Sequence, residues 1–190
     1  MGRIVVSEFI SLDGVMEGPG PDDPYEHAGW TFSYQDPAGM KFKLDELMGH
    51  DALLLGRVTY EGFAGAWPGR TDEIGFAERM NGMPKYVVSS TLEHADWERS
   101  MIISGDPASE ISKLRRELSG DMLVAGSAQL VQALLAQGLV DELRLMVFPI
   151  VLGTGRRLFA ENSAPLRLEL TGSEQLQSGT LILTYRPAGS

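Results

Sequence analysis

Short apolar runs alternate with longer amphipathic stretches along the first two thirds of the chain. The apolar runs have the length of strands and lie at residues 3–12, 52–55, 86–88, 101–103 and 122–125. Helical patterns separate most of them, and this order is typical of a largely parallel sheet with helices on both faces. The hydrophobic pattern therefore predicts an α/β fold.

Two of the predicted helices have clear boundaries. Asp36 precedes Pro37, so that Asp supplies an N-cap oxygen and Pro stands at the first helical position, and we expect this helix to reach about Met48. The second helix spans residues 127–137 with its apolar side chains on one face, and Gly138 is placed to end it.

The pattern changes after residue 141. Three strands are predicted in succession, at residues 143–152, 166–171 and 180–185, and the polar segment 172–179 separates the last two. Two strands joined in this way indicate an antiparallel hairpin. We thus expect a mixed sheet, mostly parallel, with a C-terminal antiparallel hairpin.

Composition narrows the class of protein. One domain of ordinary size fits 190 residues, so we expect a single domain over residues 1–190. A net charge of −10 without a cluster of Lys or Arg argues against nucleic acid, and the lack of cysteine, with three scattered histidines, argues against a zinc site. No run approaches the ~20 apolar residues of a membrane span. These features predict a soluble, cytoplasmic protein whose partner is a small molecule.

One predicted strand end carries residues suited to a phosphate. Gly56 and Arg57 follow a strand directly and open a helical pattern, to which Thr59 adds a hydroxyl. The N-terminus of a helix disfavours a cation unless an anion binds there. Because ligands of parallel sheets bind outside the carboxyl ends of the strands, a phosphate at this end would explain the position of Arg57.

Two further strand ends carry similar residues. Ser89 and Ser90 follow the run at 86–88, where they either donate to the same phosphate or bond the backbone of a turn. Gly126 and Ser127 lie between a strand and the clearest helix, as either an anion cradle or a tight turn with a Ser N-cap. Three such ends on one sheet edge favour a ligand that carries phosphate.

Five segments resemble the dihydrofolate-reductase-like family, and most closely the reductase domain of bacterial riboflavin biosynthesis as a stand-alone member. They are SLDG (11–14), LLLGRVTYE (53–61), VVSS (87–90), VAGSAQLVQALL (124–135) and VDELRLMVFPIVLGTGRRLF (140–159). The resemblance covers nearly the whole chain and keeps the order of the family's motifs. It implies a three-layer dihydrofolate-reductase-like α/β fold, an oxidoreductase and a homodimer.

The resemblance also implies NADPH as the cofactor. The residues that surround the adenosine 2′-phosphate in this family correspond here to Gly56, Arg57, Thr59, Ser89 and Ser90. The turn that takes the pyrophosphate corresponds to Gly126, Ser127 and Ala128, with Ser127 in place of a second glycine. A dianionic 2′-phosphate is also what Arg57 needs by charge, so NADP is favoured over NAD.

The substrate side departs from the family. Met40 stands where folate-reducing members carry an acid, which disfavours folate. Segment 17–34 has four acids and no Lys or Arg, so it would repel an anionic phosphoribosyl pyrimidine. We therefore expect an NADPH-dependent reductase of a small heterocyclic or carbonyl substrate, with pyrimidine- and pterin-like compounds included. The alternative is a non-catalytic protein of the same fold that binds NADP(H) or another small ligand.

Candidates for acid chemistry lie in the first turn and the long loop. Asp13 leaves the first strand beside the expected nicotinamide, although an Asp-Gly pair also makes a turn. Asp36 is a second candidate, with the N-cap as its alternative role. Glu26 and His27 are further candidates in the loop.

Aromatic residues recur at every second position near the end of this loop. Trp30, Phe32 and Tyr34 would share one side of an extended segment. Trp30 and Phe32 would then line a pocket for a flat substrate, or pack as a lid or a subunit contact.

Overall fold

The computed structural model describes residues 1–161 and 163–189. Its strands are β1 (Ile4–Ser11), β2 (Ala52–Gly56), β3 (Lys85–Val88), β4 (Ser100–Ile103), β5 (Met122–Val124), β6 (Glu142–Phe148), β7 (Leu168–Gln175) and β8 (Leu181–Pro187). Its helices are the 3-10 helix η1 (Trp30–Tyr34) and the α-helices α1 (Pro37–Met48), α2 (Arg57–Ala66), α3 (Phe76–Gly82), α4 (Pro107–Glu117) and α5 (Ala128–Ala136). Across these described ranges, no helix has the length and hydropathy needed to cross a bilayer.

The strands form one mixed sheet in the order β4-β3-β2-β5-β1-β6-β8-β7. In this order, every neighbouring pair from β4 across to β6 is parallel. Strand β8 then lies antiparallel to both β6 and β7. The predicted mixed sheet with a C-terminal antiparallel hairpin is confirmed.

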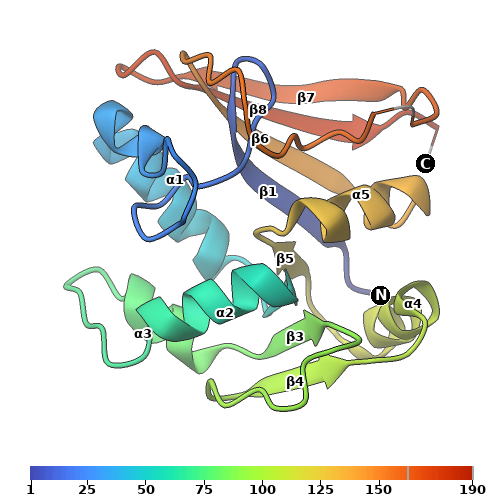
Figure 1. The fold of residues 1–190 in the computed structure, drawn as a ribbon. Helices are drawn as coiled ribbons and strands as arrows, with labels where there is room; N and C mark the ends of the chain where they lie inside the picture. Colours follow the sequence, from blue (N-terminus) through green and yellow to red (C-terminus); the bar gives the residue numbers. More distant parts are fainter. Residues whose placement is uncertain (162, 190) are drawn as a thin grey trace.

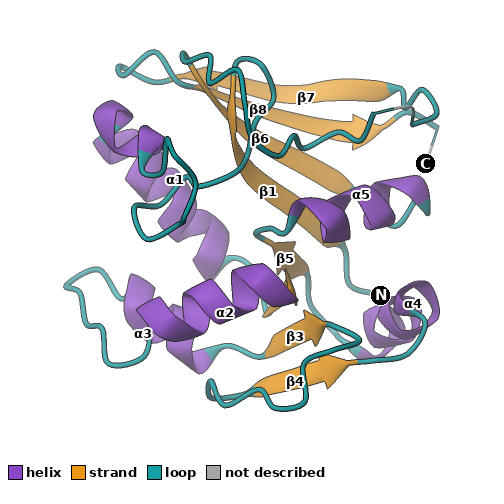
Figure 2. Cartoon of the chain, in the orientation of Figure 1, coloured by secondary structure: helices purple, strands orange, loops and turns teal. Residues whose placement is uncertain are grey.

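Helices cover both faces of the sheet and produce three layers (Figures 1 and 2). Neighbouring residues of β2 point to opposite faces. Leu53 packs in a cluster with Leu47 of α1 and Tyr60 of α2. Leu54 packs in a second cluster with Leu130 of α5. In Figure 1, α1 and α5 accordingly lie on opposite sides of β1.

The strands β1 and β5 separate part of the way along the sheet. Their ladder ends at the pair Val6 and Val124, whereas β1 continues to pair with β6 as far as Ser11. Beyond Val6, one edge of β1 is therefore free of its neighbour on the side of β5. This separation lies at the carboxyl ends of the parallel strands, where ligands bind in open α/β sheets.

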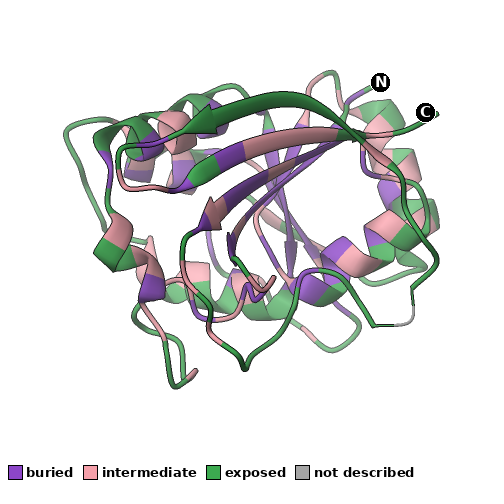
Figure 3. Ribbon diagram, turned by 90° about the horizontal axis from the view of Figure 1, so that it is seen from above, coloured by how far each residue is buried: buried purple, intermediate pink, exposed green. Residues whose placement is uncertain are grey.

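Two predicted strand boundaries in the C-terminal region are wrong. The polar segment 172–179 is not all loop, because β7 continues to Gln175. This edge strand is exposed along nearly its whole length (Figure 3), so burial imposes no alternation that a sequence could reveal. The strand predicted at 143–152 ends at Phe148, since Pro149 follows and has no N–H to continue the ladder.

Candidate functional site

The carboxyl ends of β2 and β5 bring two of the predicted phosphate-binding segments into contact. β2 ends at Gly56 and continues into α2, and the neighbouring β5 reaches α5 through Gly126 and Ser127. A Cβ atom added to Gly56 would lie 2.2 Å from Oγ of Ser127, and one added to Gly126 would lie 2.6 Å from Oγ1 of Thr59. The close approach of these two turns leaves room only for glycine at both positions.

Both helices that begin here lack a side-chain cap. α2 follows Gly56, which has no side chain, and α5 follows Ser127, whose hydroxyl makes no capping hydrogen bond. Ser127 thus holds the N-cap position of α5 that was its alternative role, but its side chain does not cap the helix. Within the described residues, the first backbone N–H groups of α2 and α5, that of Ala128 included, have no capping side chain. Two such helix starts in contact suit an anion.

Arg57 lies at the start of α2 and pairs with Glu61 one turn along the helix. Its Nη1 donates to the two carboxylate oxygens of Glu61 at 3.0 and 2.8 Å. The side chains of Arg57 and Glu61 are 43% and 47% exposed, and an exposed pair of this kind contributes only about 0.3–0.5 kcal/mol. Arg57 is therefore available to a stronger anion such as a phosphate dianion.

Ser89 and Ser90 stand near Arg57 because β2 and β3 are parallel neighbours that end together. Oγ of Ser89 accepts hydrogen bonds from the backbone N–H groups of Thr91 and Leu92 at 3.2 and 2.9 Å. Ser89 thus bonds the backbone of the turn, which was one of the two roles considered for these serines. A hydroxyl that accepts keeps its own hydrogen to donate, so this role leaves phosphate binding possible.

Asp13 joins the turn after β1 to a distant loop. Its Oδ1 accepts from Oγ of Ser11 at 2.6 Å and from the N–H of Leu152 at 3.1 Å, and its Oδ2 accepts from the N–H of Gly153 at 2.9 Å. The Ser11 hydrogen bond, together with those from the two backbone groups, lowers the pKa of Asp13 to about 2. At neutral pH Asp13 is ionised, so it can orient a donor but does not carry a proton.

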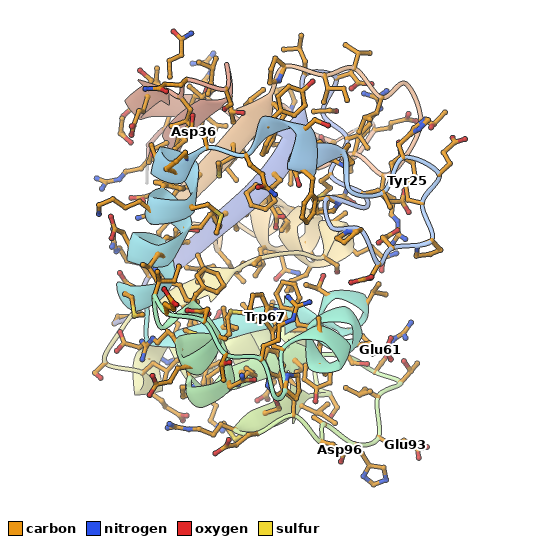
Figure 4. All side chains as sticks on the ribbon, turned by 90° about the vertical axis from the view of Figure 1, so that its left-hand side faces the viewer. Tyr25, Asp36, Glu61, Trp67, Glu93 and Asp96 are labelled. Atoms are coloured by element: carbon orange, nitrogen blue, oxygen red, sulfur yellow. The ribbon has the colours of Figure 1, made fainter. Side chains whose placement is uncertain are left out.

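Asp36 caps α1. Its Oδ1 accepts from the N–H of Ala38 at 2.9 Å and its Oδ2 accepts from the N–H of Ser178 at 3.0 Å. The hydrogen bonds from Ser178 and Ala38 lower the pKa of Asp36. Figure 4 shows Asp36 in the half of the molecule that holds the upper end of α1, well separated from Glu61 on α2.

Trp30 and Phe32 do not share one side, because residues 30–34 form a 3-10 helix and not an extended segment. Trp30 is 6% exposed, its Nε1 donates to the carbonyl of Glu17 at 2.8 Å, and its ring packs edge-on against Phe148. Phe32 is 52% exposed. The expectation that these side chains share one side of an extended segment is wrong.

Glu8 is a candidate site residue that sequence reasoning missed. It lies on β1 just past the last pair with β5, is 7% exposed, and its Oε1 accepts from the N–H of Gly126 at 2.6 Å. Desolvation by burial raises the pKa of Glu8 to about 8. The only signal in the sequence is that a carboxylate stands within the apolar run 3–12. If this run is a central parallel strand, both of its faces are buried, and the carboxylate is buried with them.

These residues fit a phosphorylated dinucleotide. Two uncapped helix starts meet at glycines that have no room for a Cβ, and Ser127 offers a hydroxyl that does not cap its helix. Among the residues that the structure describes, Arg57 is held by one exposed ion pair. Backbone donors of this kind bind pyrophosphate, and a guanidinium beside them binds a phosphate monoester.

Comparison with known proteins gives relatives along the whole length of the chain. The model of the RibD C-terminal domain family matches residues 3–182. The uncharacterized protein YyaP of Bacillus subtilis (strain 168) is 27% identical over 186 residues, which are 96% of this chain and 94% of that protein.

Solved structures show the same fold at lower sequence identity. A protein of Shewanella sp. PV-4 described as a candidate riboflavin biosynthesis protein is 22% identical with a TM-score of 0.74, over 97% of this chain and 98% of that one. Dihydrofolate reductase from Enterococcus faecalis, complexed with NADP(H) and RAB-propyl, is 17% identical with a TM-score of 0.64, over 98% and 97%. The fold is thus dihydrofolate-reductase-like, and the chain belongs to the RibD C-terminal domain family.

Proposed function

We propose that this chain is an NADPH-dependent reductase of a small heterocyclic or carbonyl compound, with pyrimidine- and pterin-like compounds included. The observation that carries the proposal is the contact between the uncapped starts of α2 and α5, with Arg57 at the first helical position of one of them. Membership of the RibD C-terminal domain family supports a reductase, and the likeness to a dihydrofolate reductase that binds NADP(H) supports the cofactor.

Two groups of residues divide the binding of the cofactor. The pyrophosphate is assigned to the open helix starts, with Gly56, Gly126, Ser127 and Ala128. The 2′-phosphate is assigned to Arg57, Thr59, Ser89 and Ser90 at the ends of β2 and β3. When bound, NADPH supplies a hydride, and the chain positions the substrate and manages the proton.

A cavity of about 480 Å³ on the flank of α2 sharpens this assignment. Its walls include the carboxylates of Glu61 and Asp96, together with Tyr60 and Trp97. Figure 4 shows Glu61 and Asp96 in the same lower part of the molecule. Carboxylates repel a phosphate, so we place the 2′-phosphate at the start of α2 and not in this cavity.

The substrate side involves Asp13, Asp36, Trp30 and Phe32 in different ways. Asp13 is an ionised group that orients the turn beside the nicotinamide end. Asp36 fixes the start of α1. Of the aromatic pair, only Phe32 offers a large exposed surface to a substrate or to a second subunit, because Trp30 is buried against Phe148. We further propose that residues 1–190 form one domain and that the protein is a homodimer.

The test of the proposal is titration with NADPH and NADH, followed by cofactor fluorescence and by thermal unfolding. Arg57→Ala is expected to weaken NADPH by about tenfold or more and NADH very little, since a charge-assisted hydrogen bond contributes about 1.5–3 kcal/mol. Lys41→Ala is the matched control, because Lys41 also pairs with an exposed carboxylate four residues along a helix, namely Asp45 of α1. Equal losses for both cofactors would remove the 2′-phosphate assignment, and no binding of either at millimolar concentration would end the proposal.

A non-catalytic binding protein is the second candidate. It is favoured by Met40, which is 56% exposed and offers no acid, and by Asp13, which is ionised. Oxidation of NADPH over a panel of pterins, pyrimidines, quinones and carbonyl compounds distinguishes the two. Tight binding of NADPH without oxidation by any member of the panel would favour the second candidate.

A further inference from the structure

Glu8 occupies the point where the sheet opens. A ladder continued from Val6 and Val124 would set Glu8 opposite Gly126. The N–H of Gly126 instead donates to the side chain of Glu8, at 2.6 Å. The carboxyl therefore takes the place of a backbone acceptor and spans the widening space between β1 and β5.

The order of the strands locates this carboxyl relative to the proposed cofactor. Strands β3, β2, β5 and β1 are successive neighbours. The 2′-phosphate is assigned to the ends of β3 and β2, and the pyrophosphate to the ends of β2 and β5. If the extended dinucleotide continues in the same direction, its nicotinamide end reaches the ends of β5 and β1. Glu8 lies at this place.

The surroundings of Glu8 favour its neutral form. The side chain is buried, and the charged groups that act on it are Lys43 and Glu46, both on α1. Lys43 donates to Oγ of Ser7 at 2.8 Å and pairs with Glu46, so its charge is largely compensated. Desolvation by burial is the largest cause and, with a smaller contribution from Glu46, it outweighs the Gly126 hydrogen bond and the charge of Lys43, both of which lower the pKa of Glu8, so that this pKa is raised.

A protonated Glu8 still has a hydrogen-bond donor to offer. Its Oε1 receives the N–H of Gly126, and among the described residues its Oε2 has no hydrogen-bond partner. A neutral carboxyl has one O–H donor, and this group is complementary to the oxygen of a primary carboxamide. An ionised Glu8 would have no donor and would repel a pyrophosphate held at the neighbouring starts of α2 and α5.

We propose that Glu8 binds the nicotinamide end of the cofactor in its protonated form, so that the chain takes up a proton when NADPH binds at alkaline pH. This inference rests on the proposed function and adds to it a binding residue and a pH dependence. Glu8→Gln keeps the shape and a donor but cannot ionise.

The test compares two ligands at pH 7 and pH 9. With a pKa of about 8, NADPH affinity of the unaltered protein is expected to fall about tenfold between these values, and that of Glu8→Gln to stay within about twofold. The probe 2′,5′-ADP lacks the nicotinamide end, and its affinity is expected to stay constant in both proteins. If both ligands bind and Glu8→Gln keeps the pH dependence of the unaltered protein, the inference is overturned and the proposed function stands. If neither ligand binds at millimolar concentration, the proposed function fails first.

A second measurement uses the unaltered protein alone and does not depend on the folding of a variant. Calorimetric titration with NADPH at pH 8, in two buffers of different ionisation enthalpy, gives the number of protons taken up. About half a proton is expected for a group with a pKa near 8. No uptake would overturn the inference.

Discussion

Four of the α-helices begin in two contrasting ways, while α3 gives its first N–H groups to the preceding Asp72. α1 and α4 are each capped by an aspartate, Asp36 or Asp106, whose carboxylate accepts a backbone N–H of the first turn. α2 and α5 begin after Gly56 and Ser127 without any side-chain cap, and these two starts touch each other. A capped helix start contributes to stability, whereas an open one keeps its N–H groups for a ligand. The contrast separates positions that serve the fold from positions kept for binding.

The largest expected effect on NADPH affinity comes from adding a side-chain atom where the starts of α2 and α5 meet. Gly126→Ala adds a Cβ 2.6 Å from Oγ1 of Thr59, at a residue with φ of 85°. We expect NADPH affinity to fall by more than about tenfold, because the turn assigned to the pyrophosphate must move and a charge-assisted hydrogen bond contributes about 1.5–3 kcal/mol. Gly138→Ala, at the other end of α5, is the matched control. Its φ is 64° with no atom near the added Cβ, so it should lose about 1 kcal/mol of stability and no affinity.

The next effect tests whether the hydroxyl of Ser127 is kept for a ligand. Ser127→Ala is expected to reduce NADPH affinity by up to about tenfold, since the hydroxyl caps nothing within the described part of the chain. Its melting temperature should stay within about 1 °C of the unaltered protein, because no cap is lost. A loss of several degrees with unchanged affinity would break the contrast between open and capped helices.

The capped helices should respond in the opposite way. Asp36→Ala removes the acceptors of both Ala38 and Ser178, and a drop of about 2–4 °C in melting temperature is expected at pH 7 with unchanged NADPH affinity. Asp106→Ala removes a more exposed cap and should lower the melting temperature less. Because hydrogen bonds lower the pKa of Asp36, its contribution is present at neutral pH and is lost as the pH falls through that lowered pKa. A loss of cofactor affinity in Asp36→Ala would place Asp36 in the binding site.

The smallest effect concerns the partner of Arg57. Glu61→Gln removes the carboxylate that competes with a phosphate for Arg57. NADPH affinity is expected to rise by about twofold, the equivalent of an exposed ion pair, and NADH affinity to stay unchanged. A fall in NADPH affinity would show that Glu61 holds Arg57 in the binding geometry.

Much of the fold follows from local patterns, and the exceptions have physical reasons. β2, β3 and β5 are buried runs bounded by polar residues, and such runs are recognisable in a sequence. β7 is an exposed edge, so its polar residues give no alternation. Trp30 and Phe32 follow a spacing that fits a strand, but their segment closes into a 3-10 helix around the Trp30 contact with Phe148.

The candidate site divides in the same way. Gly56, Arg57 and Ser127 can be found because each stands at a change from strand to helix, which a sequence displays. Glu8 cannot be found in this way, since its importance depends on where β1 separates from β5, and that separation joins residues far apart in the chain. The pairing of Arg57 with Glu61 is visible as a spacing of four on a helix, but only the exposure of both side chains shows how weak it is.

The position of β1 also has a consequence for biosynthesis. This first strand pairs with β5 and β6, whose residues are made more than a hundred positions later, as the pairs Ile4–Met122 and Ser11–Phe148 show. Strands β2, β3 and β4 are neighbours both in sequence and in the sheet, so they can assemble early. On the ribosome, β1 thus leaves well before β5 and β6 and waits for both of them, while β2, β3 and β4 can already pair with one another.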